Sequence, residues 1–133
     1  MGRLFTDQHE WVSITEDVAT VGLTRQFSQG IGDILHVELP ATDRQVEQFS
    51  VVCMLRAIGG LYEIHAPISG RILEVNQELS TFPEILSDAA EQDAWVYKLQ
   101  VAGLMGMLDR ETEKLFQEYQ YHELLRQEAE ERS

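Results

Sequence analysis

The stretch Phe49-Ser-Val-Val-Cys-Met-Leu-Arg-Ala-Ile-Gly-Gly-Leu-Tyr-Glu-Ile-His65 decides the fold of this chain. Residues 49–58 form a largely continuous apolar run, as in a strand that is buried on both faces. Gly59 and Gly60 interrupt the run, and residues 61–65 resume it. Because glycine adopts positive φ without steric cost, a glycine pair between two strand-like segments predicts a tight β-hairpin.

The segments around this hairpin have the pattern of short strands broken by turns. Residues 10–14 and 18–23 predict a second hairpin, and residues 33–39, 71–75 and 94–101 predict further strands. Residues 24–30 predict one helical turn, since Thr24 is an N-cap candidate and Gly30 closes the segment. Residues 82–86 predict another, with Pro83 in its first turn. The chain is therefore expected to be mainly β.

The sequence changes character at Asp109, which can cap a helix. No Gly or Pro interrupts the chain from there to about residue 130, so one long helix is predicted. Its apolar face is expected to consist of four residues, Leu115, Phe116, Tyr119 and Leu124. Beyond about Tyr121 no core is expected beneath the helix, and self-association or partner binding is the hypothesis for that part.

Composition excludes several classes of protein. The 133 residues are 44% apolar and 25% charged, which suits a single globular domain over residues 1–133. No apolar run is long enough to cross a bilayer, and residues 1–7 lack a signal-peptide core. A lone cysteine, Cys53, fits a reducing compartment, so a cytoplasmic protein without membrane attachment is expected. A packed thiol is favoured over a redox role for Cys53.

The formal net charge of −13 argues against nucleic acid as a partner, because phosphate backbones are repelled. The acidity either keeps the protein soluble or steers it towards a basic partner surface. The four histidines show no ligand spacing, so no metal site is expected. No phosphate-binding loop, Ser-His-Asp order or paired catalytic carboxylates occur, so no catalytic residues are assigned.

Several segments together resemble the glycine cleavage system H proteins. The resemblance covers roughly residues 4–118. The matching segments are Phe5-Thr-Asp-Gln-His-Glu-Trp-Val12, Asp17-Val-Ala-Thr-Val-Gly-Leu-Thr24, Gly32-Asp-Ile-Leu-His-Val-Glu-Leu-Pro40, Ala66-Pro-Ile-Ser-Gly-Arg-Ile-Leu-Glu-Val-Asn76, Pro83-Glu-Ile-Leu86 and Trp95-Val-Tyr-Lys98. The resemblance implies a lipoyl-domain-like barrel-sandwich hybrid with short helices, spanning about residues 4–103, followed by a C-terminal α-helix over about residues 109–130. The approach to the last strand, residues 89–95, lacks the glycines and the tyrosine of the family.

Proteins of this family are carriers and not enzymes. Their lipoyl group, joined by an amide to a lysine on an exposed hairpin, collects an aminomethyl group from glycine decarboxylase and hands it to an aminomethyltransferase. The family pattern E-S-V-K-A-x-S-D falls here on residues 56–63, so the lysine position reads Gly59 and the preceding glutamate reads Arg56. A slipped register would place Arg56 at the lysine position. Neither residue supplies an amine, so bound lipoate is not expected.

The degenerate attachment hairpin comprises Arg56, Gly59, Gly60, Leu61, Tyr62 and Glu63. It is either a relaxed turn left after the lysine was lost, or a tip that docks into a partner through Arg56, Leu61 and Tyr62. The expected function is a non-lipoylated module that acts by protein–protein interaction, as a decoy, regulator or scaffold towards glycine decarboxylase, aminomethyltransferase or lipoylating enzymes. The alternative is a working aminomethyl carrier modified at one of the only two lysines, Lys98 or Lys114.

Overall fold

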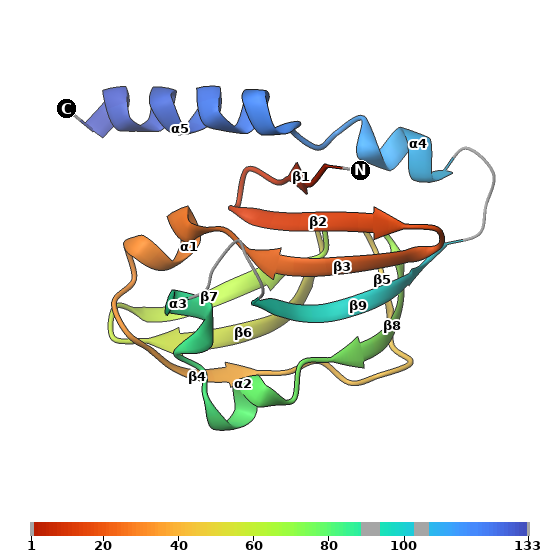
Figure 1. The fold of residues 1–133 in the computed structure, drawn as a ribbon, viewed down its shortest axis with the longest axis horizontal. Helices are drawn as coiled ribbons and strands as arrows, with labels where there is room; N and C mark the ends of the chain where they lie inside the picture. The colour runs from red at the N-terminus through yellow and green to blue at the C-terminus, as the bar shows by residue number, and fades with distance from the viewer. Residues whose placement is uncertain (1, 89–93, 103–106, 133) are drawn as a thin grey trace.

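The computed structural model describes residues 2–88, 94–102 and 107–132, and the ribbon shows two β-sheets with helices at their margins (Figure 1). The elements run in the order β1 (Leu4–Phe5), β2 (Glu10–Thr15), β3 (Val18–Leu23), α1 (Arg25–Gln29), β4 (Ile34–Glu38), β5 (Gln45–Val46), β6 (Val51–Ala57), β7 (Gly60–His65), β8 (Gly70–Val75), α2 (Glu78–Thr81), α3 (Ile85–Asp88), β9 (Trp95–Val101), α4 (Met107–Thr112) and α5 (Glu118–Arg132).

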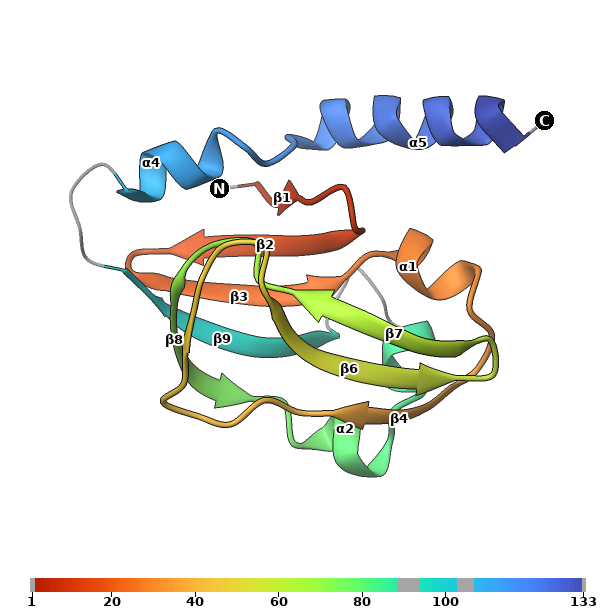
Figure 2. The ribbon, with the colours of Figure 1, turned by 180° about the vertical axis from the view of Figure 1, so that it is seen from behind.

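The two sheets have different strand orders. Within the described residues, the larger sheet is β1-β2-β3-β9-β8-β5 and the smaller one is β4-β6-β7. All neighbouring strands in both sheets are antiparallel. Seen from behind, the small sheet lies in front of the large one (Figure 2). This architecture confirms the predicted mainly β, lipoyl-domain-like fold with short helices and a helical C-terminal end.

The core lies between the two sheets, because each sheet turns its apolar face towards the other. Ala19 and Val21 of β3, Ile64 of β7 and Leu99 of β9 are all fully buried there. Full burial of a Val, Ile or Leu side chain contributes about 1.5–3 kcal/mol relative to an exposed one. The two-residue periodicity of the strands is therefore what brings the sheets face to face.

The hairpin predicted at residues 10–23 and the helical turn predicted at residues 24–30 are both present. β2 and β3 pair from Glu10↔Leu23 to Thr15↔Val18. Thr24 caps α1, since its side-chain oxygen accepts a hydrogen bond from the backbone N–H of Phe27 at 3.3 Å. The second helical turn begins at Ile85, so Pro83 lies before the helix and not within it.

The prediction that residues 49–58 are buried on both faces is wrong. β6 buries Cys53, Leu55 and Ala57, whereas Arg56 is exposed, so the strand has one core face. The register shifts between Val51 and Cys53, which marks a β-bulge at this end of the strand. The bulge turns two consecutive residues, Val52 and Cys53, into the core, which accounts for the adjacent apolar residues at this point of the run.

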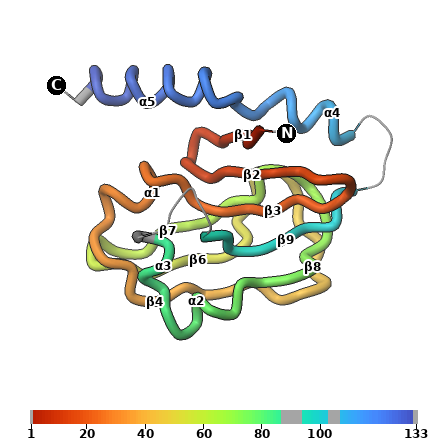
Figure 3. The backbone as a smooth tube through the Cα atoms, in the orientation of Figure 1, coloured from red at the N-terminus to blue at the C-terminus, as the bar shows by residue number. Residues whose placement is uncertain are grey.

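The prediction of one uninterrupted helix over residues 109–130 is also wrong, because the chain forms α4 and α5 with a non-helical segment of turns and one β-bridge between them. In that segment Phe116 pairs with Phe5: its N–H donates to the Phe5 carbonyl at 2.7 Å, and Phe5 returns the bond at 2.8 Å. The pairing adds to the β1 edge of the large sheet, next to which α4 and α5 lie (Figure 3). A long-range backbone pair therefore overrides the local helical preference.

Candidate functional site

The β6–β7 hairpin closes over a two-residue turn. Ala57 pairs with Gly60, so Ile58 and Gly59 form the turn and Gly60 is the first residue of β7. The sequence had instead indicated Gly59 and Gly60 as the turn. The φ angle of Gly60 is +136°, a backbone conformation that side chains with a Cβ rarely adopt. The backbone conformation directly after the turn therefore favours glycine at position 60.

The hairpin tip is tied to the loop between α1 and β4. The N–H of Ile58 donates to the carbonyl of Asp33 at 3.0 Å, and the N–H of Gly59 donates to the carbonyl of Ile31 at 2.8 Å. Gly32, with φ +79°, lies in this loop, and a Cβ placed on it would lie 3.2 Å from the Cβ of Ile58. The tip is thus held by backbone contacts and does not project freely.

Position 59 has little room for a side chain. A Cβ built on Gly59 would lie 2.9 Å from the carbonyl oxygen of Ile31 and 2.7 Å from Oη of Tyr62. The tyrosine hydroxyl is the end of a movable side chain, whereas the Ile31 oxygen belongs to the backbone that the tip itself binds. Any larger residue at this position therefore needs a backbone shift. The side chains of Ile58 and Leu61, by contrast, are 69% and 67% exposed.

The structure brings the residues of the predicted hairpin site together at one end of the small sheet. Arg56 pairs with Leu61 on β7 and with His36 on β4, while Tyr62 packs edge-on against Phe27 of α1 at a ring distance of 6.4 Å. Glu63, also on β7, is exposed. Arginine is the basic side chain that this group contributes, and its guanidinium is no substitute for a nucleophilic amine.

Both lysines lie away from the hairpin. Lys98 is half-buried on β9 of the large sheet, where its Nζ lies 5.0 Å from the centre of the Trp95 ring. Lys114 is exposed just after α4. A cation over an aromatic face is a common surface arrangement, and it accounts for Lys98 without a modification.

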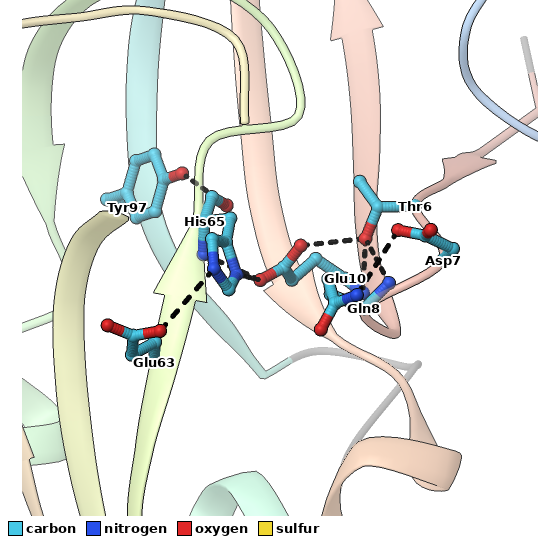
Figure 4. A network of polar contacts seen from close by, with 7 residues as sticks. All are labelled: Thr6, Asp7, Gln8, Glu10, Glu63, His65 and Tyr97. Carbon is cyan, nitrogen blue, oxygen red and sulfur yellow. Dashed lines mark hydrogen bonds and ion pairs between the residues drawn. The ribbon is translucent and has the colours of Figure 1, made fainter. Parts of the chain in front are cut away.

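A buried carboxylate links the two sheets beside the hairpin (Figure 4). Glu10, at the start of β2, is fully buried. Its Oε1 accepts a hydrogen bond from Oγ1 of Thr6 at 2.7 Å, and its Oε2 accepts one from the backbone N–H of His65 at 2.6 Å. The Nδ1 atom of His65 lies 3.1 Å from the same oxygen. Glu10 therefore links the C-terminal end of β7 to the large sheet through hydrogen bonds.

This contact changes the titration of His65. Its hydrogen bond to the Glu10 carboxylate is the largest cause that raises the pKa of His65 above its ordinary value, and partial burial acts in the opposite direction. Glu63 adds to the raised pKa, with an oxygen 3.9 Å from Nε2 of His65. Sequence reasoning missed Glu10 and His65. The burial of Glu10 could have been recognised from its position two residues before Val12. Residues i and i+2 of a strand point to the same face, so Glu10 faces the core together with that valine.

A cavity of about 580 Å³ lies between the hairpin and α1. Three parts of the chain surround it: the turn before β2, the α1 segment and the strands β6 and β7. The lining residues are Gln8, His9, Gln26, Phe27, Gly30, Ile31, Met54, Leu61, Tyr62, Glu63 and His65. Three of the predicted hairpin residues, Leu61, Tyr62 and Glu63, thus border a recess as well as solvent.

His9 contributes a structural contact between the β1–β2 turn and α5. Its Nδ1 lies 2.8 Å from the hydroxyl of Tyr121, which also lies 2.8 Å from Oγ1 of Thr24. Tyr121 is 2% exposed and stacks on Phe5 with ring centres 4.5 Å apart. Leu124 and Leu125 also pack against this cluster, so the expectation that no core lies beneath the helix beyond about Tyr121 is wrong. Tyr119, predicted on the apolar face, is instead 69% exposed.

The Cys53 thiol is buried, and burial raises its pKa to about 12, as expected for a packed thiol and not for a reactive one. Within residues 2–88, 94–102 and 107–132, no group of three or more His, Cys, Asp or Glu side chains is placed to hold a metal ion. In the same part of the chain, no helix is both long enough and apolar enough to cross a bilayer. The sequence departure at residues 89–95 falls mostly outside the described residues.

Comparison with known proteins identifies the family. The sequence model described as Glycine cleavage H-protein matches residues 3–128. A glycine cleavage system H protein of Thermotoga maritima is 36% identical over 126 residues, which are 95% of this chain and 98% of that protein. One from Staphylococcus epidermidis is 36% identical over 121 residues, covering 91% and 92%.

The fold agrees with a solved member. The crystal structure of a glycine cleavage system H protein from Mycobacterium marinum superposes with a TM-score of 0.76, at 24% identity, over 90% of this chain and 92% of that one. The model match and the two relatives, each spanning nearly the whole chain, carry the assignment. This chain therefore belongs to the glycine cleavage H-protein family, whose proteins are not enzymes themselves.

Proposed function

We propose that this chain is an H-protein-family module that has lost the lipoyl-attachment lysine and acts by protein–protein interaction. It serves as a decoy, regulator or scaffold towards glycine-cleavage enzymes or lipoylating enzymes. The observation that carries the proposal is the hairpin tip, where the attachment position reads Gly59 and no residue from 56 to 63 has an amine. A lipoyl amide needs such an amine, so the tip lacks the chemistry of the carrier.

The packing of Gly59 supports this reading. The Ile31 carbonyl, which accepts the Gly59 N–H, occupies part of the space that a side chain at position 59 would take. Overpacking of this kind costs about 1–3 kcal/mol unless the surrounding backbone moves. The tip thus suits glycine, and a lysine there would strain the contact between the hairpin and the α1–β4 loop.

The positions of the two lysines argue against the alternative carrier role. A lipoyl arm works from an exposed, projecting position, whereas Lys98 is half-buried on a strand inside the large sheet. Lys114 is exposed but follows α4, on a different part of the fold from the hairpin. Modification of either lysine would require an enzyme that does not recognise the hairpin.

The net charge of −13 favours partners with basic surfaces, since opposite charge raises the rate of encounter. The hairpin adds a contact patch of different character. Ile58 and Leu61 expose apolar side chains there, and Arg56 is exposed on the neighbouring strand position. A small apolar tip on an acidic body is suited to transient contact with another protein.

The test is the intact mass of the protein after co-expression with a lipoylating ligase and added lipoate. The natural chain is compared with Gly59→Lys and with Arg56→Lys, which cover the two possible registers. The double variant Lys98→Arg, Lys114→Arg serves as the control for modification elsewhere. A urea unfolding curve of each sample shows whether it is folded.

We expect the natural chain to gain no lipoyl group. A gain by one lysine-bearing variant alone would show that the ligase still reads the hairpin, and purified glycine decarboxylase and aminomethyltransferase would then be tested as binding partners. A gain by the natural chain that disappears in the double variant would overturn the proposal in favour of the carrier. If no variant gains mass, direct binding of the natural chain to the two enzymes and to the ligase decides whether the proposal holds.

A further inference from the structure

The open side of β7 is a free strand edge. β6 pairs with one side of β7, and no other strand in the described part of the chain pairs with the opposite side. The backbone N–H of His65 points to that open side, because it donates to Glu10 and not to β6. Strands repeat every two residues, so the backbone groups of Leu61 and Glu63 point the same way. These two positions offer main-chain donors and acceptors to an added strand.

The cavity of about 580 Å³ lies along this edge. It is bordered by residues of β7 on one side, and by Gln8 and the α1 segment with Phe27 and Ile31 on the other. An added strand would run about 4.8 Å from β7, within this recess. At one end, the contact between Glu10 and His65 already occupies the edge, so the open length is the part from Leu61 to Glu63.

The two faces of such an added strand would meet different chemistry. On the outer face stands Glu63, whose side chain is 55% exposed. On the inner face the half-buried ring of Tyr62 packs towards Phe27, next to Ile31. Neither lysine nor arginine is among the residues that line the recess. An oppositely charged cross-strand neighbour of Glu63 stabilises the pairing, and an apolar neighbour suits Tyr62.

We infer that the β7 edge is a strand-addition site for an extended peptide segment of a partner protein, in which Lys or Arg alternates with apolar residues. The inference rests on the proposed function and specifies the surface through which the module binds. Backbone hydrogen bonds to Leu61 and Glu63 provide the pairing, while Glu63 and the apolar inner wall select the side chains.

Charge argues against a second copy of this chain as the occupant. A two-fold pairing of β7 with β7 over the open length would bring the Glu63 carboxylates of both copies close together. Like charges at neighbouring cross-strand positions are destabilising. Each copy also carries a net charge of −13, which opposes association at low ionic strength. A basic peptide would avoid both the repulsion between Glu63 carboxylates and the repulsion between two acidic chains.

The test is a selection from a displayed library of random linear heptapeptides against the full chain, followed by affinity measurements with synthetic copies of the selected peptides. We expect selected peptides to alternate Lys or Arg with Val, Ile, Leu or aromatic residues. On binding, the amide signals of Leu61 and Glu63 should shift in NMR spectra, and their hydrogen exchange should slow. A variant, Leu61→Pro, removes one edge N–H and should lower the affinity at least tenfold, whereas Leu61→Ala, which keeps that N–H, should lower it less.

Two further comparisons separate the backbone and charge contributions. Glu63→Lys should lower the affinity at least tenfold, while Glu74→Lys, the same charge change at an exposed position of β8, should change it less than threefold. N-methylation of every second peptide residue should abolish binding when the methylated N–H groups face β7. Methylation of the other set, whose N–H groups point away from β7, should leave binding unchanged. This readout needs no protein variant, so it remains decisive if Leu61→Pro does not fold.

The inference is overturned if the selection gives no peptide, or acidic ones. It also fails if the selected peptides bind Leu61→Pro and Glu63→Lys as tightly as the natural chain, or tolerate N-methylation at every position. A concentration-dependent dimer that Glu63→Lys strengthens would identify a second copy as the occupant instead. None of these results bears on lipoylation, so failure at the β7 edge is distinguishable from failure of the proposed function.

Discussion

Replacement of Tyr121 by phenylalanine tests how α5 is held on the body of the protein. The ring of Tyr121 is 2% exposed and stacks on Phe5, and its hydroxyl lies 2.8 Å from both His9 Nδ1 and Thr24 Oγ1. Tyr121→Phe keeps the ring and removes the hydroxyl alone. The substitution therefore isolates the polar part of the contact between α5 and the β1–β2 turn.

The expected loss follows from the groups that are left behind. Thr24 Oγ1 still accepts the Phe27 N–H, but His9 Nδ1 loses the partner that faces it. One hydrogen bond contributes about 0.5–1.5 kcal/mol net, and an unsatisfied buried partner costs about 1–3 kcal/mol. We expect Tyr121→Phe to lower the free energy of unfolding by about 1–2 kcal/mol, or roughly 4–8 °C in the midpoint of thermal unfolding.

The assay is urea unfolding followed by tryptophan fluorescence, since Trp11 belongs to the same apolar cluster as Tyr121. Tyr119→Phe is the matched control, because the same hydroxyl is removed two residues away from a side chain that is 69% exposed. That control should stay within about 0.5 kcal/mol of the natural chain. Equal midpoints for Tyr121→Phe and Tyr119→Phe would refute the docking of α5 through this hydroxyl.

Three other predictions concern the hairpin, the buried pair and the thiol. Gly59→Ala should destabilise the protein by about 1–3 kcal/mol in urea unfolding because its Cβ meets the backbone of the facing loop, whereas Ile58→Ala, at an exposed position, should be nearly neutral. Because the folded-state pKa of His65 is raised from 6.5 by Glu10, the stabilisation by protonated His65 should be complete below about pH 6.5 and disappear as the pH rises through the raised pKa. The gap in unfolding free energy between the natural chain and His65→Gln should therefore shrink from pH 5.5 to pH 9, and a gap that widens would contradict this. Iodoacetamide at pH 8 should leave Cys53 unmodified in the folded protein and modify it in urea, as mass spectrometry would show.

Local signals in the sequence predicted local structure well. Thr24 ahead of a short segment predicted the cap of α1, and alternating residues predicted β2, β3 and β9. These features depend on neighbours within a few residues, which a reader of the sequence can see. The resemblance to the H proteins added the arrangement of the strands, which periodicity by itself does not determine.

The errors at the C-terminal helix and at Glu10 arose where distant parts of the chain meet. The helix is interrupted at Phe116 because Phe5, more than one hundred residues earlier, pairs with its backbone. The same is true of Glu10, whose burial is stabilised by His65 across 55 residues. Helical propensity and charge pattern describe the isolated chain, so neither could show that a helix would break or that a carboxylate would be buried.

The hairpin tip is also shaped by a contact with a distant part of the chain. Gly59 and Gly32 lie on opposite sides of one close approach between the hairpin and the α1–β4 loop. A lysine at position 59 would place its Cβ against the Ile31 carbonyl, so the loop would have to withdraw from the N–H groups that it now accepts. A lysine at position 59 is therefore not accommodated by that substitution alone, because the loop would also have to lie farther from the tip. We expect Gly59→Lys to be destabilised in urea unfolding relative to Arg56→Lys, whose side chain is already exposed on the strand. Equal stability of the two variants would show that the loop yields freely and that glycine at position 59 is not required by packing.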